Sequence, residues 1–120
     1  MSKTESPATS KGSTTIAPTV LATVTRLTAL AVPGVARLAP IPGGVNRLFR
    51  RGANEGIRLD VTDSSVSVEL YLVLLPETSI REVARRVQAD VARAIEETVG
   101  MRVTRIDVHV EDVDYGTAAS

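Results

Sequence analysis

The sequence predicts an α+β fold, a two-layer α-β-β-α-β domain. Three observations indicate this fold. Apolar residues in 76–100 have helical spacing, residues 57–74 alternate between apolar and polar on both sides of a turn, and residues 106–110 alternate in the same way. The simplest packing places both helices on one face of a small three-stranded sheet, because each element then buries its apolar side.

A first helix is expected to begin at Ile16-Ala17-Pro18 and to end at Pro33-Gly34. Pro18 suits the first turn, where its missing N–H costs nothing. Several threonines lower the intrinsic helix propensity, so this helix depends on packing. Its predicted apolar stripe consists of Val20, Leu21, Val24, Leu27, Ala31 and Val32.

Residues 35–56 are expected to form a long connection, because glycine and proline interrupt every pattern there. A short helical turn is expected around Val45–Phe49. Long connections inside compact domains are more often functional than accidental. The role of the Arg- and Gly-rich loop 40–56 is left open.

Residues 57–62 and 65–74 predict an antiparallel hairpin, with turn chemistry supplied by Asp63-Ser64. Period two gives this hairpin one apolar and one polar face. The third strand, at residues 106–110, either lies parallel beside the second through a right-handed crossover or pairs antiparallel with the first. Periodicity leaves both arrangements open.

The segment from Pro76 to Gly100 predicts the clearest helix in the chain. Ser79 and Glu82 form the pattern of a capping box at its start, and Gly100 suits the left-handed conformation that ends a helix. Charged residues fill the face opposite its apolar stripe. That stripe consists of Ile80, Val83, Ala84, Val87, Val91, Ile95, Thr98 and Val99.

The length of 120 residues predicts one domain with tails. We expect a disordered N-terminal tail at 1–15, the domain at 16–113 and a short C-terminal tail at 114–120. No apolar run reaches the ~18 residues that span a bilayer. The first residues lack the apolar core of a signal peptide, and cysteine is absent. These features predict a cytoplasmic protein.

The charges of the whole chain cancel, but its first half is net basic and its second half is net acidic. The formal net charge is zero, which implies no general attraction to nucleic acid or anionic lipid. Residues 1–56 carry seven basic and two acidic side chains, whereas residues 57–120 carry seven basic and twelve acidic ones. This asymmetry favours self-association or the choice of a charged partner.

Several short patterns, in their order and spacing, resemble the alkaline shock (envelope stress response) protein family of Gram-positive and related bacteria. The resemblance runs from Ile16 to about Val113. One departure is Leu75-Pro76, where the family often has a Tyr-Gly pair. The matching patterns are Ile16-Ala17-Pro18, Val32-Pro33-Gly34-Val35, the strand 66–73, Ile80–Ala84 with Val87-Gln88, and Thr98–Met101 leading to Ile106–Val110.

This resemblance implies a non-enzymatic protein of the cell-envelope stress response. It implies a homo-oligomer that a membrane-anchored protein partner holds at the inner face of the cell membrane. The family offers no catalytic, cofactor-binding or metal-binding residues to carry over, and it implies no small-molecule substrate.

The polar face of the predicted sheet provides the first candidate site. Carboxylates beside a histidine suit metal binding or acid–base catalysis. However, outward positions of a one-sided sheet are polar in any case, and the chain has a single histidine, too few for a zinc site of usual composition. We interpret the face as solvated or partner-facing. Its residues are Arg58, Asp60, Glu69, Tyr71, Asp107 and His109.

Arg47, Arg50 and Arg51 surround Phe49 and form the second candidate site. Such a cluster suits phosphates, stacked bases or anionic lipid. The alternative function is therefore a small nucleic-acid-binding module that uses the Arg47–Arg51 loop. Three clustered charges and one aromatic ring fall short of a nucleic-acid footprint, so a protein partner or solvent is favoured and nucleic acid is not.

Overall fold

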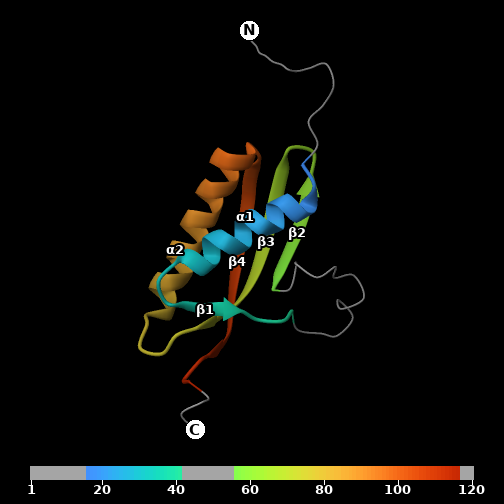
Figure 1. Ribbon diagram of the computed structural model, residues 1–120. Helices are drawn as coiled ribbons and strands as arrows, with labels where there is room; N and C mark the ends of the chain where they lie inside the picture. Colours follow the sequence, from blue (N-terminus) through green and yellow to red (C-terminus); the bar gives the residue numbers. More distant parts are fainter. Residues whose placement is uncertain (1–15, 42–55, 117–120) are drawn as a thin grey trace.

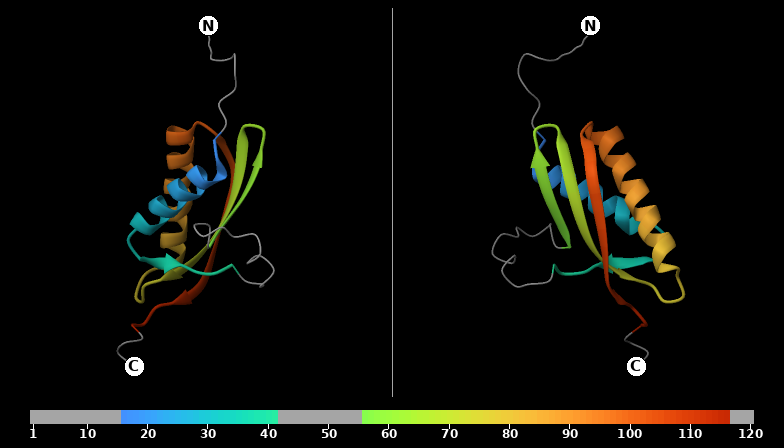
Figure 2. Two further views of the ribbon diagram at one scale, coloured as in Figure 1. Left: turned by 45° about the vertical axis from the view of Figure 1, so that its right-hand side comes forward. Right: turned by 180° about the vertical axis from the view of Figure 1, so that it is seen from behind.

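The computed structural model describes residues 16–41 and 56–116. They form a mixed sheet whose helices lie together on one face (Figures 1 and 2). The predicted α+β class is confirmed. The elements in chain order are α1 (Pro18–Ala31), β1 (Val35–Leu38), β2 (Ile57–Thr62), β3 (Ser65–Leu74), α2 (Ile80–Ala94), the π-helical turn η2 (Ile95–Val99) and β4 (Arg102–Val113).

Strand β3 is the centre of the sheet, because each other strand pairs with it. β2 and β1 follow each other along one edge of β3, both antiparallel to it, and β4 runs parallel along the opposite edge. Along this edge of β3, the hydrogen-bonded partner strand changes from β2 to β1 at Tyr71. The Tyr71 N–H donates to Gly56 O at 2.9 Å, and the Tyr71 carbonyl accepts from Ala39 N–H at 2.7 Å. The parallel alternative for the last strand is therefore the one observed.

The prediction of a three-stranded sheet was wrong by one strand. β1 lies in the segment that was expected to be only a connection. Its four residues are too few to show alternation, and proline stands close to it on both sides. The strand forms because the ten residues of β3 extend beyond β2, so the backbone of residues 72–74 needs another partner.

The main core lies between β3 and the two helices. Alternate residues of β3, from Val66 to Leu74, face the helices and are each 1% exposed or less. α2 and η2 bury Val83, Val87, Val91 and Ile95 against them. The Ser79 hydroxyl accepts a hydrogen bond from Glu82 N–H at 3.3 Å at the start of α2, and Gly100 takes a positive φ of 84° after η2. The Ser79 half of the predicted capping box and the predicted ending at Gly100 are confirmed.

Helix α1 buries a stripe that differs from the predicted one. Leu21 and Val32 are buried as expected, but Val20 and Leu27 are 47% and 58% exposed. The buried positions between Leu21 and Val32 are small residues: Ala22, Thr25 and Ala29. The predicted and the observed stripe both have helical spacing. Choosing the stripe with the more hydrophobic residues therefore gives the wrong buried side of α1.

The chain remains attached to the sheet directly after β4. Asp114 Oδ2 accepts a hydrogen bond from Arg37 Nη1 of β1 at 2.7 Å, and Asp114 Oδ1 accepts one from Gly116 N–H at 2.9 Å. The Gly116 bond, followed by the Arg37 guanidinium, lowers the pKa of Asp114 below its ordinary value. β1 is thereby linked to the end of β4 as well as to β3.

Candidate interaction surface

The face of the sheet opposite the helices, here called the helix-free face, carries the polar side chains of β2, β3 and β4. Along each strand, the residues that do not face the core are mostly polar and point to the helix-free face. The parallel register places the polar residues of β3 beside those of β4. The neighbouring pairs are Ser67 with Arg105, Glu69 with Asp107, and Tyr71 with His109.

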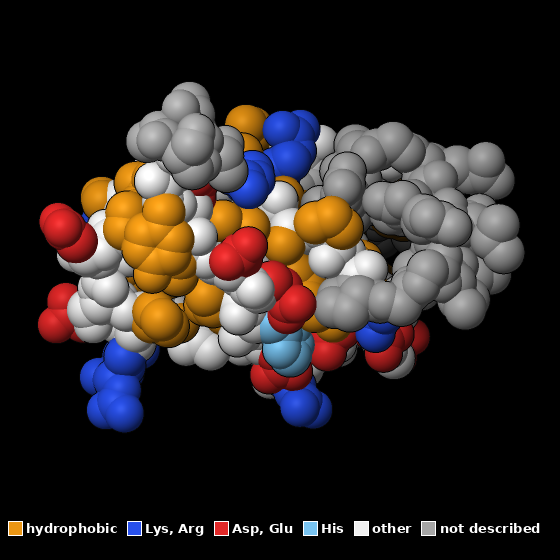
Figure 3. All heavy atoms as spheres, turned by 90° about the horizontal axis from the view of Figure 1, so that it is seen from below, with side chains coloured by type: hydrophobic (Ala, Val, Ile, Leu, Met, Phe, Trp, Pro, Cys, Tyr) orange, Lys and Arg blue, Asp and Glu red, His pale blue; other side chains and the backbone are white. Residues whose placement is uncertain are grey.

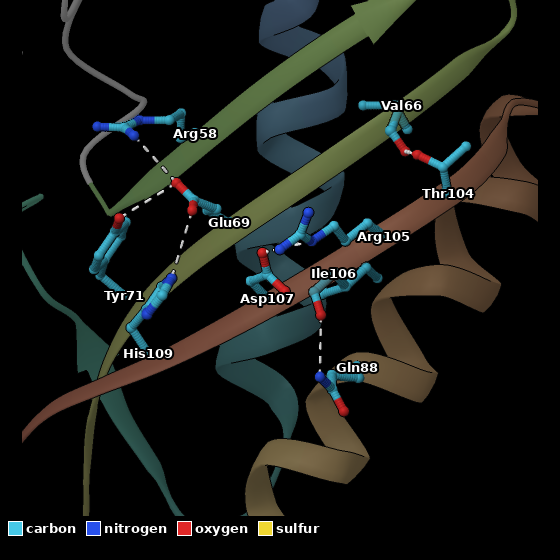
Figure 4. Close-up of polar contacts among 10 residues, drawn as sticks. All are labelled: Arg58, Val66, Glu69, Tyr71, Gln88, Thr104, Arg105, Ile106, Asp107 and His109. Carbon is cyan, nitrogen blue, oxygen red and sulfur yellow. Dashed lines mark hydrogen bonds and ion pairs between the residues drawn. The ribbon is translucent and has the colours of Figure 1, made fainter.

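Glu69 joins three strands through its carboxylate (Figure 4). Its Oε1 accepts hydrogen bonds from Arg58 Nη1 of β2 at 3.2 Å and from Tyr71 OH at 3.3 Å. Its Oε2 lies 3.6 Å from His109 Nε2 of β4. The carboxylate therefore lies among an arginine, a phenol and an imidazole.

Tyr71 and His109 stack on each other, with ring centroids 4.6 Å apart and ring planes 16° apart. Tyr71 is only 8% exposed and belongs to a small second cluster with Ala39 and Val73. Burial raises the pKa of the Tyr71 phenol, and the Glu69 carboxylate adds to the rise. The stack forms the partly apolar part of the helix-free face.

A shallow depression of about 240 Å³ lies beside this network. Arg105 Nε contacts Asp107 Oδ2 at 2.9 Å there, as Arg58 contacts Glu69. Both guanidiniums are therefore already paired with carboxylates of the same face. Figure 3, a view of one end of the molecule, shows acidic side chains gathered around the histidine. The depression is lined by Arg58, Asp60, Ser67, Val68, Glu69, Arg105 and Asp107.

The structure brings together five of the predicted partner-binding residues: Arg58, Glu69, Tyr71, Asp107 and His109. That they bind a partner stays a prediction. The other four, Arg47, Phe49, Arg50 and Arg51, lie outside the described residues, as does the expected turn at Val45–Phe49.

Sequence reasoning did not select Arg105 and Ser67 as site residues. Arg105 stands two residues before Asp107, so the same period-two pattern places it on the helix-free face. In the described ranges, no group of histidine and carboxylate side chains is arranged to hold a metal ion.

A second exposed surface lies on the outer side of α1. Val20, Leu27 and Leu30 are 47%, 58% and 39% exposed, and their spacing places them along one side of the helix. Arg26 is the one charged residue among the 14 residues of α1. We call Val20, Leu27 and Leu30 the α1 apolar strip.

The pH dependence of stability tests the environment of Tyr71. Because burial raises the pKa of this phenol, the unfolded chain releases the proton at lower pH than the folded protein does. The stabilisation that the protonated Tyr71 phenol gives the folded protein is complete below pH 10.0, its ordinary pKa. It is lost as pH rises through the raised pKa. Urea titrations between about pH 8 and 11 should therefore show a falling free energy of unfolding.

Tyr71→Phe should make this fall smaller. The matched control is Tyr115→Phe, because Tyr115 is 76% exposed. An equal fall in the Tyr71→Phe variant and in the unaltered protein would contradict the assignment.

Comparison with known proteins identifies the family. Residues 6–115 match the model of the ASP23 family of alkaline shock proteins, which is described as having a cell envelope-related function. The chain belongs to the alkaline shock protein family. This confirms the resemblance inferred from the sequence, and the description given for the family names no enzymatic activity.

Two curated relatives come from Bacillus subtilis (strain 168). YqhY is 26% identical over 110 residues, which cover 90% of this chain and 82% of YqhY. YloU is 25% identical over 83 residues, which cover 68% of this chain and 69% of YloU. Both alignments extend over most of each protein.

Solved structures of the MamM CTD share the fold. One variant is 18% identical with a TM-score of 0.56, covering 78% of this chain and 93% of its own. A zinc form of another variant has the same identity, TM-score and coverage of this chain, with 84% of its own chain covered. At this identity the likeness shows the fold alone. Within the described residues, no helix has both the length and the apolarity needed to cross a membrane.

Proposed function

We propose that this protein is a non-enzymatic interaction protein of the cell-envelope stress response. It acts through self-association and through a membrane-anchored partner, which holds it at the inner face of the cell membrane. The cell envelope-related description of the alkaline shock protein family supports the setting. The observation that carries the proposal is the composition of the helix-free face.

The charged groups of the helix-free face are arranged for recognition. Arg58 and Arg105 pair with neighbouring carboxylates at 3.2 and 2.9 Å. Tyr71 and His109 stack on each other next to these pairs, one step further along the β3–β4 register. Arginine and tyrosine are enriched in protein interfaces, where rigid rings and planar guanidiniums give contact area at low entropic cost.

The two surfaces suit different partners. The helix-free face alternates positive and negative charges, which suits contact with a second copy of the same chain. The α1 apolar strip carries three exposed aliphatic side chains, which suit a groove or helix of the membrane-anchored partner. Self-association and membrane attachment can therefore occur on one molecule at the same time.

Size measurement and membrane fractionation test the proposal together. The purified protein should form oligomers in analytical ultracentrifugation, and the protein in its native cells should co-sediment with membranes. Purified protein alone should not bind protein-free vesicles, because attachment requires the partner. A strict monomer that stays in the supernatant of native cell extracts would overturn the proposal.

Leu27→Glu is expected to remove most of the protein from the membrane fraction, because it places a charge in the centre of the α1 apolar strip. Leu27 is 58% exposed, so folding should be little affected. Thr19→Glu is the matched control, since Thr19 is also exposed on α1 but is not part of the strip. Equal membrane fractions for both variants would exclude the strip as the attachment surface. Leu27→Glu should leave the oligomeric state unchanged.

A further inference from the structure

The outer edge of β4 has the properties of an unfinished sheet. β4 has 12 residues and pairs with β3 along one edge, and no described strand lies along its other edge. Ile106, Val108 and Val110 are only partly buried, whereas their β3 neighbours Val68, Leu70 and Leu72 are 1% exposed or less. A long edge strand with partly exposed aliphatic side chains is a template for another strand.

Side chains of the preceding helix cover only the first half of this edge. Gln88 Nε2 donates to Ile106 O at 3.0 Å, and Val103 N–H donates to Glu96 Oε2 at 3.4 Å (Figure 4 shows the first of these). Among the described residues, no side chain bonds to the backbone of 107–111. The edge is therefore open from its middle onward.

The Gln88 bond also fixes the direction of the backbone groups. Because Ile106 O accepts from α2, this carbonyl points away from β3. The β3–β4 register is continuous from Ile106 to Val108. N–H and C=O of alternate residues in a strand point to the same side. Val108 therefore presents both groups to the open edge.

The charges of β4 change sign symmetrically about Val108. Arg105 and Asp107 precede Val108, and His109 and Glu111 follow it. When such a strand pairs antiparallel with its own copy about Val108, Arg105 lies opposite Glu111 and Asp107 lies opposite His109. The apolar side chains of Ile106 and Val110 are opposite each other on the other face.

We infer that two copies of this chain pair through the open edges of their β4 strands, antiparallel and with the two-fold axis at Val108. This inference rests on the self-association proposed above. It places the contact at the β4 edge of the helix-free face, where Arg105, Asp107 and His109 meet the copy, and gives it a register. Val108 and its copy exchange both of their backbone hydrogen bonds, as the outward direction of these groups requires. The two sheets become one continuous sheet, with the helices of both copies on the same side.

Other registers are less favourable. If the axis moves to Asp107, that carboxylate lies opposite its own copy. If it moves to His109, Asp107 lies opposite Glu111. Like charges directly opposite each other destabilise a strand pair. Axes at Ile106 or Val110 would also set opposite charges against each other, but Ile106 O already accepts from Gln88 and the β3–β4 register shifts directly after Val110. Charge order and the open part of the edge together therefore select the register centred on Val108.

Charge reversal tests this pairing. Arg105→Glu places like charges opposite each other twice in the dimer, and Glu111→Arg does the same with the opposite sign. Each variant should raise the dissociation constant of self-association about tenfold. The double variant Arg105→Glu/Glu111→Arg should restore it. Positions 105 and 111 are six residues apart along an extended strand, roughly 20 Å, so the restoration cannot arise within one copy.

A cross-link tests the axis directly. The chain has no cysteine, so Val108→Cys introduces its one thiol. In an antiparallel hydrogen-bonded pair the Cα atoms are about 5.5 Å apart, within the range for a disulfide. Oxidised glutathione should give a covalent dimer as it is reduced to two thiols. Val61→Cys is the matched control, because Val61 is a 44% exposed valine on the opposite edge of the sheet, and it should remain monomeric on a denaturing gel.

The outcomes separate this inference from the proposed function. Rescue by the double variant together with a Val108→Cys dimer supports the β4 pairing. If the unaltered protein self-associates but both charge reversals leave its dissociation constant unchanged, the β4 pairing is overturned and the proposed function stands. A dimer through Val61→Cys and not through Val108→Cys overturns it equally. If the unaltered protein is a monomer that never co-sediments with membranes, both fall.

Discussion

Leu72→Ala is expected to lower the free energy of unfolding by about 2–5 kcal/mol, as truncation of a fully buried leucine does. Leu72 is fully buried, with 0% exposure. It lies opposite Leu38 of β1 and opposite Val110 of β4, so the cavity left by the truncation adjoins both outer strands. The surrounding strands are fixed by their hydrogen bonds and cannot close the cavity fully.

Urea unfolding followed by circular dichroism measures this loss. Val61→Ala serves as the control, because Val61 is 44% exposed on β2 and its truncation should cost well under half as much. Similar losses in the two variants would show that the centre of the core does not lie on β3.

Gly56→Ala is expected to cost about 2–4 kcal/mol, for two reasons that add. Gly56 has a positive φ of 82°, which an L side chain adopts only with strain. A Cβ at this position would also lie 2.8 Å from Ala39 O and 2.8 Å from Leu38 Cβ. This is the point where β2 and β1 meet along β3, so the close approach of two backbones leaves no room for a methyl group.

Gly100→Ala separates the two causes. Gly100 has nearly the same φ, 84°, but nothing lies within 4 Å of the Cβ that would be added. Its substitution should cost only the backbone strain, about 1–2 kcal/mol. The difference between the two variants in thermal or urea unfolding measures the steric part at Gly56. Equal losses would mean that β1 and β2 move apart easily.

The main features of the fold could be predicted because long elements carry strong patterns. The Ser79 cap, the Gly100 terminus and the stripe between them defined the α2–η2 helix, and alternation from Val66 to Leu74 defined β3. β1 was missed because its four residues carry no usable period. The direction of β4 was undetermined because parallel and antiparallel strands have the same alternation. The buried side of α1 was mispredicted because close packing selected Thr25 and Ala29 over Leu27.

For the candidate interaction surface, the sequence predicted which residues point away from the core but not which of them contact each other. Period two identified Arg58, Glu69, Tyr71, Asp107 and His109 as members of one polar face. Their partners depend on strand register, which the sequence does not specify. The Tyr71–His109 stack requires β3 and β4 to be parallel and aligned at those residues. The open edge of β4 likewise became visible only with the strand order.

Because β1, β2 and β4 are joined in the described sheet only through β3, the sheet has no stable part that lacks this strand. Removing β3 leaves three strands with no hydrogen-bonded neighbour. The β2–β3 hairpin closes through a two-residue turn, whereas β1 and β4 must close much longer loops onto the same strand, at a greater entropic cost. The domain is therefore built to fold as a single cooperative unit. We expect the hairpin to form first and the contacts distant in sequence to form last, because short loops close at lower entropic cost.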